Sequence, residues 1–149
     1  MRLSVFSPKK SAQLFIDLRK IYHDYLPAEQ LTDECLSTLI TQADSSLYVT
    51  LFNGRHLGAI QITIKKTTAA LSLLTVRALT RRRGVATNLL REVEKRLKID
   101  GINNITMDYS EILQGDKEGL ILFMQANGYY INQDTSTLQK SLSDEDLTT

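Results

Sequence analysis

Apolar residues recur with two different periods along this chain, and the changes of period predict where helices and strands lie. Residues 3–6 alternate between apolar and polar side chains, which is typical of a strand. Over Ser11–Tyr25 the apolar residues return every three or four positions, which predicts an amphipathic helix that Pro27 ends. A second helix is expected over Thr32–Ala43, because either Thr32 or Asp33 is a favourable N-cap.

The middle of the chain is expected to form an antiparallel meander. Strands are predicted over Ser46–Asn53 and His56–Lys65, and the Asn53-Gly54 pair between them is a strong hairpin signal. Ala69–Val76 lacks clean alternation, which favours a central strand covered on both faces.

The second half is expected to alternate helices and strands. The clearest helix spans Gly84–Ile99, with an apolar stripe on one side and charged residues, Glu94 among them, pointing outward. The remaining elements are a strand at Ile105–Tyr109, a helix at Asp116–Asn127, and strands at Tyr129–Gln133 and Thr135–Ser141. The resulting order β-α-α-β-β-β-α-β-α-β-β predicts an α/β fold with a mixed sheet: one domain over residues 1–141, and a disordered polar tail over 142–149.

Composition narrows the functional classes. The chain has 149 residues, the size of one domain, and no apolar run long enough for a membrane helix. Its one cysteine, Cys35, cannot form an internal disulfide, so we expect a cytoplasmic protein in which Cys35 is buried and inert. His23 and His56 have no metal-ligand spacing, so no metal site is expected.

Charge is unevenly distributed although the net charge is only +1. The segment between Asp44 and Glu92 contains no acidic residue but eight basic ones: Arg55, Lys65, Lys66, Arg77, Arg81, Arg82, Arg83 and Arg91. A solvated basic face is one interpretation, and anion binding is the other. Nucleic-acid binding is disfavoured because no aromatic residues are interleaved with the arginines.

The arginine run leads directly into the clearest helix, which favours anion binding. The segment reads Arg81-Arg82-Arg83-Gly84-Val85-Ala86-Thr87, after an apolar strand and before the helix. Backbone N–H groups in the first helical turn have no partner within the helix, and the helix dipole adds partial positive charge. A pyrophosphate would therefore find both donors and neutralising guanidinium groups here.

These residues resemble the signature of the GCN5-related N-acetyltransferase (GNAT) superfamily. Its acyl-CoA motif Gln/Arg-x-x-Gly-x-Gly/Ala is similar to Arg81-x-x-Gly84-x-Ala86, and the segment 122–129, LFMQANGY, looks like a second landmark. A narrower resemblance, in residues 74–85 and in 123–128, is to the aspartate 1-decarboxylase maturation and regulatory factors of the PanZ/PanM type. Residues 16–25 and 52–57 also look similar to that family, whereas the stretch 32–45 and the tail depart from it.

The resemblance implies a GNAT-like, mostly antiparallel twisted sheet, a cofactor and a protein partner. Acetyl-CoA or CoA would contact Leu74, Thr75, Val76, Arg81, Arg82, Arg83, Gly84, Val85, Ala86, Thr87 and Phe123, although Phe123 could equally be a plain core aromatic. Asn53 and Arg55 would contact the decarboxylase, or be a turn residue and a solvated cation. In that family the acyl-CoA-bound protein promotes self-cleavage of the decarboxylase zymogen and couples pantothenate and CoA synthesis to the CoA level.

An N-acetyltransferase acting on a small amine or a protein N-terminus is the alternative function. It needs a base and a proton donor. No acid occurs from Ser45 through Arg91, and Met124 stands where the superfamily commonly has a tyrosine. Five residues could substitute, each with a simpler structural interpretation, such as an exposed hairpin position for His56 and core packing for Tyr129: Tyr109, Glu111, Tyr129, Tyr130 and His56. No catalytic residue is therefore assigned.

Overall fold

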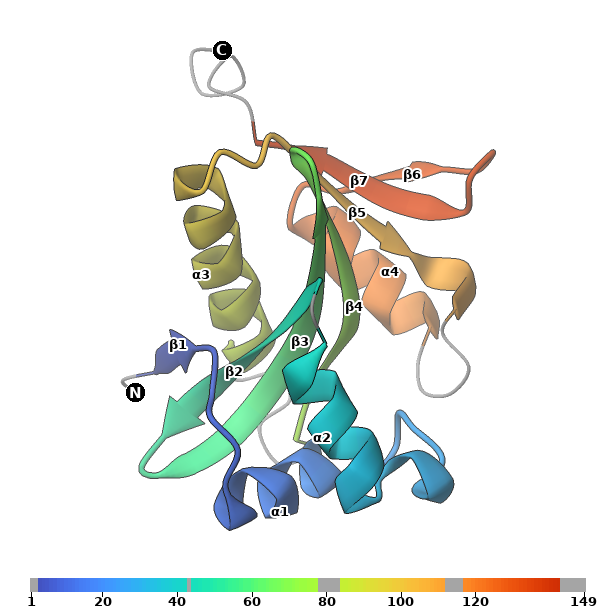
Figure 1. Cartoon of the computed structure of the whole chain (residues 1–149). Helices are drawn as coiled ribbons and strands as arrows, with labels where there is room; N and C mark the ends of the chain where they lie inside the picture. Colours follow the sequence, from blue (N-terminus) through green and yellow to red (C-terminus); the bar gives the residue numbers. More distant parts are fainter. Residues whose placement is uncertain (1–2, 43, 78–83, 112–116, 143–149) are drawn as a thin grey trace.

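Seven strands form one sheet in the order β1-β2-β3-β4-β5-β7-β6, flanked by four α-helices (Figure 1). The computed structural model describes residues 3–42, 44–77, 84–111 and 117–142. The elements are β1 (Ser4–Phe6), α1 (Ala12–Ile21), a 3₁₀ turn (Ala28–Gln30), α2 (Asp33–Thr41), β2 (Ser45–Phe52), β3 (Arg55–Lys65), β4 (Thr68–Val76), α3 (Val85–Ile99), β5 (Asn104–Asp108), a 3₁₀ turn (Tyr109–Glu111), α4 (Lys117–Ala126), β6 (Tyr130–Asn132) and β7 (Thr137–Ser141). The predicted order and mixed-sheet class are confirmed.

Within this sheet β4 and β5 run parallel, and the other neighbouring strand pairs are antiparallel. Short turns join β2 to β3, β3 to β4 and β6 to β7, and in the first of these Asn53 and Gly54 have φ of 50° and 76°. Both residues of a type I′ turn need positive φ, so this pair fixes the hairpin.

The two faces of the sheet are covered by different helices. One core cluster joins Leu89 and Leu90 of α3 with Met124 of α4 and Ile60 of β3. The other joins Leu14 and Leu18 of α1 with Leu36 of α2 and Ala59, the neighbour of Ile60 on β3. Successive strand residues point to opposite faces, so α3 and α4 lie on one face, and α1 and α2 lie on the other (Figure 1).

Local side-chain caps explain where the first two helices begin. The Ser11 hydroxyl accepts from Leu14 N at 3.0 Å, and the Thr32 hydroxyl accepts from Cys35 N at 3.3 Å. Helix α1 ends at Ile21, short of the predicted Tyr25, because the Tyr22 carbonyl instead accepts hydrogen bonds from the next turn.

Three sequence-based expectations about burial are wrong. Ala70 on β4 is exposed, because α1 and α2 cover β2 and β3 but leave this part of β4 open. Cys35 is exposed in the first turn of α2. The Glu94 side chain is only 12% exposed, and it binds Lys140 of β7. Leu142 packs against the core, and the rest of the expected tail, 143–149, lies outside the described residues.

Candidate functional site: the start of α3 and the free edge of β4

Helix α3 begins at a glycine, so its N-cap residue has no side chain to cap the first backbone donors. Its N-cap, Gly84, has φ 78° and ψ 6°, a left-handed conformation that glycine adopts without strain. The first three N–H groups of the helix belong to Val85, Ala86 and Thr87, and the helical hydrogen-bond pattern starts with Asn88 N to Gly84 O at 2.9 Å. A Cβ built on Gly84 would have no atom within 4 Å, so a ligand can approach the backbone closely.

The N-terminus of α3 is held against the sheet by tight packing. Val85 is 1% exposed and forms a small cluster with Leu57 of β3 and Val76 of β4. Gly58 permits this approach, because a Cβ there would lie 2.9 Å from Val76 Cγ1. The helix donors are therefore fixed beside the end of β4.

Strand β4 has a free edge over the segment that leads toward α3. Its parallel ladder with β5 ends at the pair Leu71–Met107, whereas its antiparallel ladder with β3 continues to the pair Gly58–Val76. Over residues 72–76 no described strand pairs with β4 on the β5 side. Leu74 and Val76 are 3% and 7% exposed, so this segment offers a ligand its backbone groups rather than these side chains.

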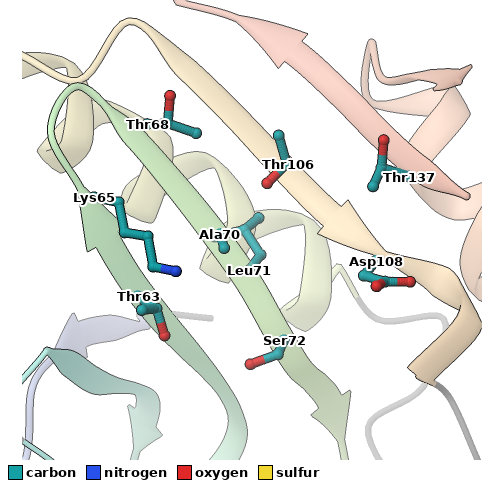
Figure 2. Close-up of a pocket in the computed structure, with 9 residues that line it drawn as sticks. All are labelled: Thr63, Lys65, Thr68, Ala70, Leu71, Ser72, Thr106, Asp108 and Thr137. Carbon is teal, nitrogen blue, oxygen red and sulfur yellow. The ribbon is translucent and has the colours of Figure 1, made fainter. Parts of the chain in front are cut away.

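On the α1 and α2 face, the open part of the sheet forms a shallow depression of about 350 Å³ (Figure 2). Its lining is rich in hydroxyls and comes from four strands: Thr63, Lys65, Thr68, Ala70, Leu71, Ser72, Thr106, Asp108 and Thr137. Asp108 ends β5, directly after the last β4–β5 pair, so it is a carboxylate at the point where the two strands separate. Its Oδ1 accepts from Ser110 N at 2.9 Å and from Ser110 Oγ at 2.6 Å.

A buried carboxylate, Asp17 of α1, holds the turn end of the β2–β3 hairpin. Asp17 Oδ1 accepts from Arg55 Nε at 3.0 Å and Nη2 at 2.7 Å, and Oδ2 accepts from His56 N at 2.9 Å. His56 Nδ1 lies 2.8 Å from the same Oδ2, and Gln13 Nε2 donates to Oδ1 at 2.9 Å. Burial by itself would raise the pKa of Asp17, but the hydrogen bonds from Arg55, His56 and Gln13 outweigh it and hold that pKa well below its usual value.

A family model described as "Acetyltransferase (GNAT) domain, PanZ" matches residues 3–138. The chain belongs to the PanZ family of GNAT domains. The PanD regulatory factor of Salmonella typhimurium is 35% identical over 124 residues, which cover 83% of this chain and 87% of the relative. That of Escherichia coli is 34% identical over 134 residues, which cover 89% and 95%. The solution structure of E. coli YhhK bound to coenzyme A matches with a TM-score of 0.73 and 32% identity, covering 95% of this chain and 99% of the other.

The site residues expected from the sequence fall into two groups in this PanZ-family chain. The structure brings together the free edge of β4 and the first turn of α3, with Leu74, Thr75 and Val76 in one and Gly84, Val85, Ala86 and Thr87 in the other. Arg81, Arg82 and Arg83 lie outside the described residues. Phe123 on α4 packs, partly buried, against the core cluster that contains Leu74.

Of the residues considered as catalytic substitutes, Tyr129, His56 and Tyr130 bind other side chains, and Tyr109 packs, partly buried, against the core. The Tyr129 hydroxyl donates to Glu94 Oε2 at 2.7 Å; burial and the nearby carboxylate raise the pKa of Tyr129, so the phenol stays protonated. His56 is 8% exposed rather than an exposed hairpin residue. Tyr130 is 57% exposed on β6, an edge strand, and the Glu111 side chain is not among the described ones. Met124 occupies the position where the superfamily commonly has a tyrosine that donates a proton to the leaving group. It is fully buried, and its thioether cannot donate a proton.

Two functional groups were missed by reasoning from the sequence. Asp108 ends the short strand β5, and nothing local in the sequence shows that β4 separates from β5 beside it. Asp17 stands on the polar side of an amphipathic helix pattern, and its partners Arg55 and His56 follow 38 and 39 residues later. Arg55, expected as a partner contact or a solvated cation, is ion-paired with Asp17, and its side chain is 41% exposed.

Two searches of the described residues gave no further site. Within the described ranges, no helix combines the length and apolar character that crossing a membrane requires. Across the same ranges, no group of three or more His, Cys, Asp or Glu side chains is arranged to hold a metal ion.

We expect Asp17→Asn to lower the free energy of unfolding by about 1.5–3 kcal/mol at neutral pH, since it weakens hydrogen bonds made to a charged group. Because the folded-state pKa of Asp17 is depressed, its stabilisation is fully present above the ordinary value of 3.8 and is lost progressively as pH falls from there toward the folded-state pKa. Urea unfolding from pH 7 to pH 3 should therefore show the difference in unfolding free energy between the two proteins beginning to narrow below pH 4, by about 1 kcal/mol at pH 3.

The matched control is Asp134→Asn, which changes an exposed aspartate in the β6–β7 turn. It should leave the free energy of unfolding within about 0.5 kcal/mol of the original. The proposed role of the Asp17 charge would be contradicted if the original protein and Asp17→Asn differed in unfolding free energy by the same amount across this pH range.

Proposed function

We propose that this protein is an acetyl-CoA- or CoA-binding regulator of aspartate 1-decarboxylase. In this role it binds the decarboxylase zymogen, promotes the self-cleavage that forms the pyruvoyl enzyme, and couples pantothenate and CoA synthesis to the CoA level. The observation that carries the proposal is membership of the PanZ family along nearly the whole chain, with relatives named PanD regulatory factor.

The geometry at the start of α3 fits the diphosphate of CoA. The first-turn N–H groups of Val85, Ala86 and Thr87, which have no acceptor within the helix, would supply donors next to Gly84 at the positive end of the helix dipole. Ala86 allows close approach because its side chain is small. The guanidinium groups of Arg81, Arg82 and Arg83 would neutralise the diphosphate and the 3′-phosphate.

The free edge of β4 fits the pantetheine arm. An extended amide-containing chain can add to an open strand edge through main-chain hydrogen bonds, as peptides do. Leu74, Thr75 and Val76 supply that edge, next to α3. Phe123 of α4, which packs against the same core cluster as Leu74, would flank the arm.

The β2–β3 hairpin fits the partner contact. Asn53 is exposed at its tip, and Arg55 keeps part of its guanidinium accessible while Asp17 fixes its orientation. A charged group held by a buried carboxylate loses little further freedom on binding, which favours recognition. The decarboxylase would therefore contact Asn53 and Arg55.

We expect CoA and acetyl-CoA to stabilise the protein by about 2.7 kcal/mol at a ligand concentration of 100 times Kd, and dephospho-CoA to stabilise it less. Thermal-shift measurements with the three ligands test this, because the arginines would contact the 3′-phosphate that dephospho-CoA lacks. Arg82→Ala should reduce the difference between the thermal shifts that CoA and dephospho-CoA produce. Arg91→Ala, at an exposed position on α3, should leave that difference unchanged. Equal thermal shifts for all three ligands would contradict the proposed contact between the arginines and the 3′-phosphate.

We expect purified zymogen to be cleaved faster when this protein and acetyl-CoA are both added than with either alone. Chain cleavage followed on a gel measures it. Asn53→Ala should slow cleavage and keep the acetyl-CoA thermal shift, whereas Asn103→Ala, exposed at the opposite end of the sheet, should change neither. Cleavage that proceeds at the same rate without this protein would refute the regulatory role.

An N-acetyltransferase remains a second candidate because Asp108 places a carboxylate where β4 and β5 separate. Such a group could accept the proton of an attacking amine. Under the regulatory proposal, amines should release no CoA thiol from acetyl-CoA above background. Amine-dependent thiol release that Asp108→Asn abolishes and Asp134→Asn retains would instead favour the transferase.

A further inference from the structure

Tyr22, directly after α1, is a buried phenol whose hydroxyl reaches across to strand β4. It is 0% exposed, and it donates to the backbone carbonyl of Leu73 at 2.8 Å. Burial raises the pKa of Tyr22, so the phenol remains a hydrogen-bond donor across the physiological range. No step of the proposed function has yet used this group.

Leu73 needs such support because its backbone is strained. It has φ 54°, the left-handed region, which costs a leucine free energy that the surrounding structure must supply. The residue lies in an irregularity of the β3–β4 ladder, where Ala59 pairs with Thr75 but Gln61 pairs with Ser72. It is also two residues past Leu71, the last residue of β4 that pairs with β5. The bulge therefore marks where the free edge of β4 begins.

The same helix contacts the hairpin through Asp17. Asp17 lies five residues before Tyr22, and its carboxylate accepts hydrogen bonds from Arg55 and from the backbone N–H of His56. Leu14 and Leu18, both 0% exposed, pack α1 against the sheet. Helix α1 and the Tyr22 that follows it therefore contact both the bulge of β4 and the hairpin.

We propose that Tyr22 is a positioning residue that holds the β4 bulge in its coenzyme-accepting form and links that form, through α1 and Asp17, to the β2–β3 hairpin. This inference rests on the proposed function. A coenzyme chain hydrogen-bonded along Leu74–Val76 stabilises one arrangement of the bulge, which fixes the Leu73 carbonyl and hence Tyr22. Because α1 moves as a unit with its core contacts, the hairpin is ordered in the same step.

The link has to be reciprocal. If coenzyme tightens partner binding by a given factor, the partner tightens coenzyme binding by the same factor, and factors of about 5- to 150-fold are typical. The ratio of partner affinities with and without acetyl-CoA is therefore the quantity that Tyr22 controls.

The first experiment measures that ratio, by calorimetry or surface binding with immobilised decarboxylase zymogen, for the original protein, Tyr22→Phe and Tyr130→Phe. Tyr22→Phe keeps the ring and removes only the hydroxyl, and we expect its ratio to fall toward one. Tyr130→Phe is the matched control, since it removes an exposed hydroxyl on β6, and it should keep the original ratio. A folded Tyr22→Phe protein with an unchanged ratio overturns the inference.

The second experiment uses the unaltered protein, so it does not depend on a variant that folds. Hydrogen exchange is followed at the His56 backbone amide, which donates to Asp17 and reports directly on the α1–hairpin contact. Acetyl-CoA should slow exchange at this amide as well as along Leu74–Val76. Protection confined to β4 and α3 overturns the link, whereas a protein that binds neither acetyl-CoA nor zymogen contradicts the proposed function itself.

Discussion

The short parallel ladder between β4 and β5 is the constraint on which the candidate site depends. It consists of four residue pairs, from Thr68–Asn104 to Leu71–Met107, after which β4 continues in contact with β3 alone. A strand with one unpaired edge exposes main-chain donors and acceptors, which favours an extended ligand. Because Val85 packs on Val76, the first turn of α3 lies at the end of that same edge.

The helices cover the two faces of the sheet to different extents. Helices α3 and α4 bury one face, and Tyr129, Glu94 and Lys140 tie α3 to β7 on that side. Helices α1 and α2 cover only part of the other face, which leaves the hydroxyl-lined depression beside Asp108 open. The part of β4 from Thr68 to Ser72 can therefore be approached from an open face while the core beneath it stays closed.

Much of the fold could be predicted because its signals are local. Ser11 and Thr32 cap their helices through residues three positions away, and Asn53-Gly54 forms its turn from its own backbone preferences. The helix after Gly84 followed from an apolar stripe, which needs no knowledge of its partners. The predictions for the C-terminal end of α1 and for the burial of Cys35 and Ala70 were wrong. Contacts with neighbouring segments decide where that helix ends and which side chains are exposed.

The sequence by itself determined the element order, the glycine-led start of α3 and the resemblance that placed a cofactor there, since each depends on residues close together in the chain. Only the tertiary structure decided where the pairing of β4 with β5 ends and which buried polar groups form hydrogen bonds with one another. Tyr22 and Leu73 are 51 residues apart, and Asp17 and Arg55 are 38 apart. Contacts at such separations form only when helix α1 packs on the sheet, because no periodicity or spacing in the chain specifies them.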